Sequence, residues 1–260
     1  MIRLKNEKQI NGIRTSCKML SSMYRELIPL VKPGIQTIEL DMWVRDWIKK
    51  AGGKPAFLNY SPKPKGKPFP CAICISVNEE VIHSIPSKRR IRDGDLVSLD
   101  CGIDLGGFIS DQAVSVEAGN VNMEVKKLNK AACDSLYKGL AAVKAGERLL
   151  QIARAVEGHI NPFGYGIVKE YCGHGVGLGI HEDPHVPNTP HGANPKMCNG
   201  MVFAIEPMIN MGTSDVELLE DEWTVVTADE KVSAHWEHTV AIYGGKTEVL
   251  TEPLENMVFK

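Results

Sequence analysis

Apolar residues recur three or four positions apart in four segments of the chain, which is the spacing of a helix with one buried face. The first segment is expected to end before Pro33-Gly34, and the second to begin after Thr37 as its N-cap and to end at Gly52-Gly53. The apolar positions of the first segment are Ile10, Ile13, Cys17, Leu20, Met23 and Leu27. The predicted helices cover residues 6–31, 38–51, 121–144 and 147–160.

Shorter apolar runs after each pair of helices predict strands, so the order of helix, helix and strands occurs twice. The segment 31-VKPGIQTIEL-40 also resembles 143-VKAGERLLQI-152. We therefore expect one α/β (α+β) domain over residues 1–260, whose halves of roughly 1–120 and 121–260 are related by a pseudo-twofold axis. Each half would pack its two helices on an antiparallel sheet. The predicted strands cover residues 72–77, 96–104, 107–116, 166–172, 201–206, 223–227 and 236–243.

The stretch 97-VSLDCGIDLGGFISD-111 predicts a tight hairpin with an aspartate near each end. A turn centred between Leu105 and Gly106 would place Asp100 directly opposite Asp111. Directly opposed residues have Cβ atoms about 5 Å apart, and like charges at that distance destabilise a sheet. A shared proton, a nearby arginine or lysine, or a bound cation would have to offset the repulsion.

Composition narrows the class of protein. A formal charge of −2 gives no electrostatic basis for binding DNA, and no apolar run approaches the ~18 residues that span a bilayer. Seven cysteines, an odd number, fit reduced thiols in the cytoplasm better than a disulfide framework. The pair Cys71 and Cys74 lacks a second pair, so a structural zinc is not expected there.

Three further segments carry groups that could bind metal. The glycine-rich run 172-CGHGVGLGIHEDP-184 holds His174 and His181, 202-VFAIEP-207 ends in Glu206, and 234-AHWEHTVAIY-243 places Glu237 in an apolar strand. Each segment alone could be an ordinary loop or strand end. Together with the aspartate pair, they form a donor set dominated by carboxylates with one imidazole, which suits two divalent first-row cations. The residues thus indicate a dinuclear metallohydrolase.

The same residues resemble, in order and spacing, the metal ligands of the methionine aminopeptidases. The phrases 76-SVNEEVIHSIP-86, 94-GDLVSLDCG-102, 173-GHGVGLGIHEDP-184 and 202-VFAIEP-207 are similar to signatures of that family. The resemblance covers nearly the whole chain and is to the bacterial type I enzymes. It implies the pita-bread fold, with a dinuclear metal cleft between the two halves. The five expected metal ligands are Asp100, Asp111, His174, Glu206 and Glu237.

The resemblance also implies roles for these groups. Asp111 and Glu237 would bridge two ions of Mn, Fe, Co or Zn, Asp100 would complete one ion's shell, and His174 with Glu206 would complete the other's. Glu206 would be the general base. His181 would contact the substrate carbonyl oxygen, and His83 the scissile amide nitrogen.

Further positions are expected to bind the substrate or a third ion. The methionine side chain would lie against Tyr60, Cys74, Ile180 and Trp223, with the Pro/Lys-rich loop 61–70 near its entrance. The resemblance also implies one Na or K ion bound by backbone carbonyls of Asn78, Glu80 and Ser233.

The activity implied by the resemblance is removal of the initiator methionine from nascent proteins whose second residue is small. We expect a cytoplasmic monomer with no DNA or membrane partner and with the ribosome as a candidate partner. Two other functions remain open: a proline-specific peptidase, which shares the fold and the five ligands, and a non-catalytic binding module of the same fold.

Overall fold

The four long helices form where the hydrophobic pattern predicts them. The computed structural model describes residues 1–62 and 66–259. The first helix has Asn6 as its N-cap, whose side chain accepts a hydrogen bond from the Gln9 amide, and the helix buries the predicted apolar face. The helices are α1 (Glu7–Leu27), α2 (Thr37–Lys50), α3 (Met123–Ala141), α4 (Leu150–Ile160) and the short α5 (Glu255–Val258), with 3₁₀ turns η1 (Ile28–Leu30) and η2 (Asn161–Phe163).

The start of α2 corrects one expectation. Thr37 is its first helical residue rather than its N-cap, which is Gln36, and the backbone N–H of Gln36 donates to the Glu39 carboxylate. The Thr37 hydroxyl instead donates to the Ser87 carbonyl and accepts from the Ser87 N–H. A partner distant in sequence therefore satisfies this hydroxyl, and the helix begins one residue earlier than predicted.

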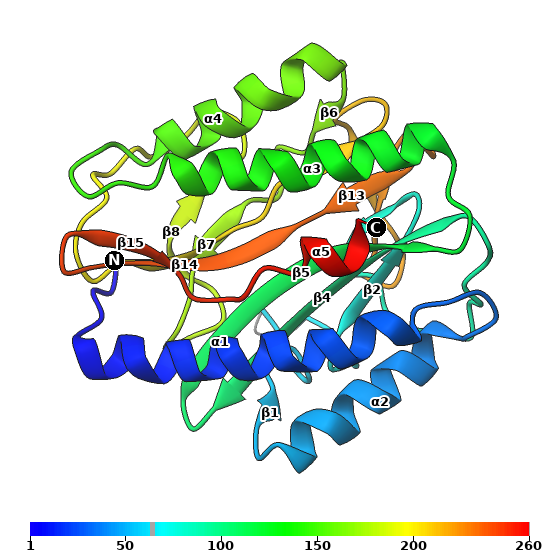
Figure 1. Ribbon diagram of the computed structural model, residues 1–260, viewed down its shortest axis with the longest axis horizontal. Helices are drawn as coiled ribbons and strands as arrows, with labels where there is room; N and C mark the ends of the chain where they lie inside the picture. The colour runs from blue at the N-terminus through cyan, green and yellow to red at the C-terminus, as the bar shows by residue number, and fades with distance from the viewer. Residues whose placement is uncertain (63–65, 260) are drawn as a thin grey trace.

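A central antiparallel sheet carries the site. Its strands run in the order β1-β4-β5-β14-β9-β7-β8, with β2 also pairing with β4 and β15 with β14. Figure 1 shows α1 and α2 beside one part of this sheet and α3 and α4 beside the other. The strands of the central sheet are β1 (Lys54–Pro55), β2 (Cys74–Val77), β4 (Asp95–Leu105), β5 (Phe108–Ala118), β7 (Gly173–Gly175), β8 (Glu182–Val186), β9 (Val202–Ile205), β14 (Glu237–Tyr243) and β15 (Lys246–Val249).

Two small three-stranded sheets, ordered β13-β10-β6 and β11-β12-β3, complete the described structure. Most of their strands are absent from the sequence-based prediction, because a strand of two or three residues is too short to show a periodic pattern. The expected strand over 166–172 is limited to two residues. The strands of these sheets are β3 (Glu80–Ile82), β6 (Gly166–Ile167), β10 (Met208–Asn210), β11 (Val216–Leu218), β12 (Val225–Thr227) and β13 (Ser233–His235).

The predicted register of the β4–β5 hairpin is wrong by two residues. Leu105 pairs with Phe108, so the two-residue loop is Gly106-Gly107, and both glycines have positive φ (63° and 87°). A two-residue hairpin loop of this kind needs positive φ at both positions, which costs glycine little and would strain leucine. Asp100 consequently lies opposite Ala113 rather than Asp111. The two aspartates are diagonal neighbours on one face, so they remain close.

Candidate metal centre

Five neighbouring elements of the central sheet each supply one of the predicted metal ligands. Along the order β4, β5, β14, β9 and β7, the ligands are Asp100, Asp111, Glu237, Glu206 (directly after β9) and His174. All five are buried and line one cavity of ≈ 630 Å³. Residues separated by up to 137 positions in sequence therefore meet because the strands that carry them are adjacent.

Glycines on both sides of His174 let its strand fit between β8 and β9. A Cβ on Gly173 would collide with the Ala204 carbonyl, and one on Gly175 with the Asp183 carbonyl. The His174 Nδ1 lies 3.0 Å from the Gly175 carbonyl oxygen. Because a carbonyl can only accept, Nδ1 carries the proton, and Nε2 is left with a lone pair directed toward the carboxylates.

The distances describe a compact donor cluster. The His174 Nε2 is 3.4 Å from Glu206 Oε1 and 3.7 Å from Asp111 Oδ2. Asp111, His174 and Glu237 each have one potential ligand atom in a group whose members are all within 4.8 Å of one another. Buried oxygens of Asp100, Asp111 and Glu237 have no hydrogen-bond partner among the described residues. Leaving a buried acceptor unpaired costs roughly 1–3 kcal/mol, so this donor set fits a cation.

Burial also changes the protonation of the carboxyl groups. It raises the pKa of Asp100 to about 7 and that of Glu206 to about 8. Burial, followed by repulsion from the neighbouring carboxylates, raises the pKa values of Asp111 and Glu237 well above their ordinary range. Without a cation the site would therefore retain protons near neutral pH, and a bound cation would displace them.

The two predicted substrate histidines line the same cavity. His83 follows β3 with φ of 58°, and its ring lies edge-on to Tyr171. The His181 Nδ1 is 2.7 Å from the Tyr60 hydroxyl, and its ring centroid is 4.3 Å from that of His174. Burial lowers the pKa of His83 to about 3 and that of His181 to about 4, so both rings are neutral at pH 7.

Apolar and aromatic side chains form the wall of the cavity beside these histidines. Tyr60, Cys74 and Trp223 line the cavity, whereas Ile180 does not line it but packs in the same hydrophobic cluster as these three residues. The Trp223 indole donates to the Lys67 carbonyl at 3.0 Å, so this ring is fixed at the wall rather than buried in the core. Part of the predicted entrance loop, residues 63–65, lies outside the described structure.

Comparison with known proteins agrees with this geometry. The model of metallopeptidase family M24 matches residues 11–243. This chain belongs to family M24. The methionine aminopeptidase of Treponema pallidum is 50% identical over 257 residues, covering 98% of each chain. Methionine aminopeptidase 1 of Bacillus subtilis is 42% identical over 96% of this chain and 99% of its own.

Solved structures give the same result for the fold. The crystal structure of methionine aminopeptidase from Rickettsia prowazekii superposes with a TM-score of 0.92 at 33% identity, covering 97% of this chain and all of that one. A Xaa-Pro dipeptidase from Bacillus anthracis has a TM-score of 0.74 at 19% identity and covers 96% of this chain and 62% of that one, which shows the fold alone. The predicted pita-bread fold and the resemblance to bacterial methionine aminopeptidases are confirmed. This M24 chain is a metal-dependent peptidase.

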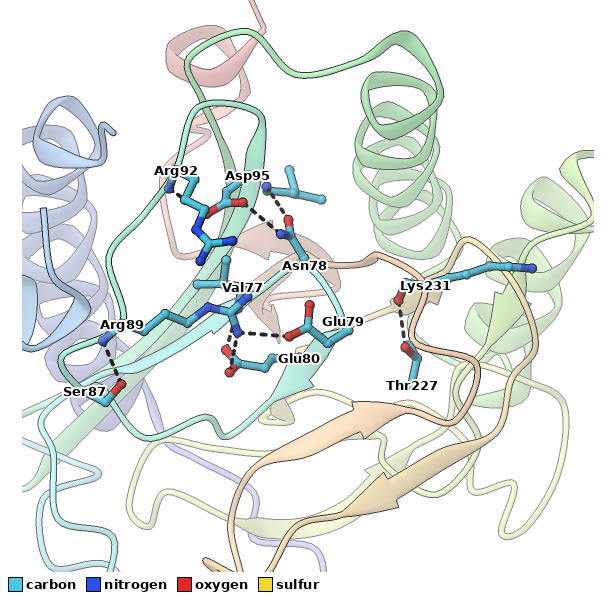
Figure 2. A network of polar contacts seen from close by, with 11 residues as sticks. Val77, Asn78, Glu79, Glu80, Ser87, Arg89, Arg92, Asp95, Thr227 and Lys231 are labelled. Carbon is cyan, nitrogen blue, oxygen red and sulfur yellow. Dashed lines mark hydrogen bonds and ion pairs between the residues drawn. The ribbon is translucent and has the colours of Figure 1, made fainter. Parts of the chain in front are cut away.

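A polar network holds the turn that precedes His83 in the M24 peptidase. Figure 2 shows Arg89 donating through one nitrogen to Glu79 at 3.0 Å and to Glu80 at 2.7 Å. The other oxygen of Glu80 accepts from the Val77 N–H at 2.8 Å. These contacts close the turn between β2 and β3 and fix the chain just before the left-handed residue His83.

The predicted monovalent-cation site falls in the same turn. Asn78 and Ser233 are adjacent, because the Ser233 N–H donates to the Asn78 carbonyl at 2.8 Å. The Asn78 side chain donates to Asp95 (Figure 2). It also accepts from the Leu96 N–H. Binding of Na or K by Asn78, Glu80 and Ser233 stays a prediction.

A buried ion pair fixes the loop of His181. Lys5 Nζ lies 2.8 Å from Glu182 Oε2, with the two side chains 1% and 4% exposed. The other oxygen of Glu182 accepts from the N–H groups of Leu178 and Gly179 at 2.8 and 2.7 Å. The sequence analysis did not identify this pair, because its two members are 177 positions apart and neither interrupts an apolar pattern.

Replacing Lys5 with methionine should lower the free energy of unfolding by about 3–5 kcal/mol, because the Glu182 charge is then buried without an opposite charge beside it. The His181 loop should loosen, and kcat/KM should fall roughly ten- to a hundredfold. Urea unfolding and steady-state kinetics measure both effects. Lys5→Met combined with Glu182→Gln removes the unpaired charge and should recover part of the stability. The exposed neighbour Lys8 provides the control, and a Lys5→Met protein as stable as Lys8→Met would contradict the prediction.

Proposed function

We propose that this M24 peptidase removes N-terminal methionine from peptides whose second residue is small. The observation that carries the proposal is the convergence of five metal-ligand side chains in a cavity with apolar walls. Full-length relatives that are 42–50% identical and named methionine aminopeptidases support the choice of substrate.

We propose that Asp100, Asp111, His174, Glu206 and Glu237 hold two divalent ions, drawn from Mn, Fe, Co and Zn. The unpartnered buried oxygens and the single lone-pair nitrogen fit such a pair. When bound, the ions supply Lewis acidity that polarises the scissile carbonyl and lowers the pKa of a water.

The roles of the protein groups follow from their positions. Glu206 is the general base and moves a proton from water to the leaving amine, because a bound cation displaces its own proton and leaves a carboxylate buried beside the ions. His181 has its Nδ1 on the Tyr60 hydroxyl, which leaves Nε2 for the substrate carbonyl oxygen. His83, directly after β3 and the fixed turn between β2 and β3, binds the scissile amide nitrogen.

The wall formed by Tyr60, Cys74 and Trp223 binds the unbranched thioether side chain of methionine. Sulfur contacts with aromatic rings and an apolar surface favour such a side chain over charged ones. Ile180 supports this wall by packing in one hydrophobic cluster with it. Nascent chains are the proposed physiological substrates. A monomeric state, contact with the ribosome and a cytoplasmic location remain predictions; the described structure has no helix long and apolar enough to span a membrane.

A peptide assay tests the proposal. Metal-free protein loaded separately with Mn(II), Co(II) or Fe(II) is incubated with Met-Gly-Met-Met, Met-Leu-Met-Met and an X-Pro dipeptide. Methionine should be released from the first peptide and much more slowly from the second. Cleavage of the X-Pro dipeptide alone would assign the chain to the proline-specific branch. Silence on all three peptides with metal bound would indicate a binding module.

A further inference from the structure

A further buried imidazole, His235, lies next to Glu206 at the edge of the proposed metal centre. It is the last residue of β13, it is 1% exposed, and neither of its ring nitrogens has a hydrogen-bond partner among the described residues. Its Nε2 lies 3.6 Å from Glu206 Oε2. The His235 N–H donates to Ser115 Oγ at 2.9 Å and its carbonyl accepts from the same hydroxyl, so the backbone that carries the ring is fixed.

An imidazole buried without partners is costly, because each unpaired polar atom loses its hydration without compensation. The described residues contain eight buried side-chain atoms of this kind: three are oxygens of the predicted ligands Asp100, Asp111 and Glu237, and two are the ring nitrogens of His235, beside the ligand Glu206. The carboxylate oxygens are explained by the proposed ions. The ring of His235 needs its own explanation.

Glu206 lies between two imidazoles. Its Oε1 is 3.4 Å from His174 Nε2, and its Oε2 is 3.6 Å from His235 Nε2. His174 also lies 3.7 Å from Asp111 Oδ2 and groups with Asp111 and Glu237, whereas His235 has no carboxylate other than Glu206 within ion-pair distance among the described residues. His174 is thus placed as a ligand, and His235 is placed to contact the far oxygen of a ligand.

We infer that His235 is a positioning residue of the metal centre, whose Nε2–H donates to Glu206 Oε2 and holds Oε1 toward the ions. The hydrogen bond forms when the 3.6 Å separation closes by about 0.5 Å, which a small rotation of either side chain provides. Partners of this kind behind a metal ligand typically contribute 10- to 100-fold to metal affinity. The inference rests on the proposed metal centre.

Binding of Mn(II) to metal-free protein, followed by isothermal titration calorimetry, tests the inference without using activity. The Kd of His235→Leu should rise 10- to 100-fold. His235→Gln should stay within a few-fold of the parent, because its amide nitrogen reaches the position of Nε2 and can donate. His235→Asn is equally polar but too short, so it should bind Mn(II) at least tenfold more weakly than His235→Gln. The comparison of Gln with Asn remains informative if the leucine variant fails to fold.

His238→Leu serves as the matched control. His238 is an equally buried imidazole, but its nitrogens contact Thr251 at 2.7 Å and Tyr137 at 3.3 Å. Its loss should lower stability and leave the Mn(II) Kd within about twofold. A parent protein that binds no Mn(II) would refute the proposed metal centre itself. A parent that binds while the His235 variants bind equally well would refute only the role of His235.

The visible absorption of the Co(II)-loaded variants checks the mode of action. If His235 only donates a hydrogen bond to Glu206, the Co(II) ligands stay the same without it. The Co(II) absorption bands of His235→Leu should then keep nearly the same positions as in the parent. A large shift that appears in His235→Leu and not in His238→Leu would mean that His235 binds the metal directly, and would overturn the positioning role.

Discussion

Replacing Glu206 with glutamine is expected to lower kcat by roughly 10³- to 10⁴-fold at saturating metal. Glutamine has nearly the same shape but cannot accept a proton, so proton transfer from the attacking water to the leaving amine is lost. KM should change much less, because the side-chain pocket formed by Tyr60, Cys74 and Trp223 is intact. Steady-state kinetics on Met-Gly-Met-Met, with metal content verified for each sample, measures the effect.

Glu170→Gln is the appropriate control for Glu206→Gln. Glu170 is an exposed carboxylate on the wall of the same cavity, so its substitution removes a similar charge from the same region. Its kcat should stay within about twofold of the parent. Retention of more than a tenth of the parental kcat by Glu206→Gln would show that another group is the base.

Metal-free protein is expected to lose stability as the pH rises from about 6.5 to 8. Asp100 and Glu206, with pKa values raised to about 7 and about 8, hold protons when folded, whereas the unfolded chain has already released them. A group whose pKa is raised by folding contributes stability that disappears as the pH passes through the raised pKa. The buried histidines, whose pKa values are lowered, act in the opposite direction only below about pH 6.5.

The expected loss over this interval is on the order of 2 kcal/mol for each carboxyl that remains protonated in the folded state. Urea unfolding in the presence of a chelator, at several pH values, measures it. Saturating Mn(II) should remove the decline and add about 2.7 kcal/mol at a hundredfold excess over Kd. Asp111→Asn, which removes one crowded carboxylate, should reduce the slope. A metal-free protein equally stable at pH 6.5 and pH 8 would contradict the raised pKa values.

The sequence predicts which polar residues line the cavity better than it predicts their arrangement. Four are carboxylates within or directly after an apolar strand and His174 stands in a glycine-rich run, and both contrasts are visible without a structure. The hairpin register could not be read from the apolar pattern, because shifting it by two residues keeps every side chain on its face. The register is fixed instead by the hairpin loop, whose two residues need positive φ, a requirement that Gly106 and Gly107 meet.

His235 and the pair of Lys5 with Glu182 were missed for a different reason. His235 stands in the quoted run 234-AHWEHTVAIY-243, but an unpaired imidazole cannot be distinguished from a bonded one without its neighbours. His238, three residues later, is fully hydrogen-bonded. The buried ion pair needs knowledge of which distant segments touch, and local composition carries no such information.

The position of β14 in the sheet has a consequence for how the protein assembles. This strand begins at Glu237 yet lies between β5 and β9, which are otherwise not neighbours. A growing polypeptide that has reached only residue 236 therefore holds two separate groups of strands, each with an open edge. Pairing of β14 with both groups creates the long-range contacts and places Glu237 between Asp111 and Glu206, so the pairing that closes the sheet also assembles the candidate metal centre.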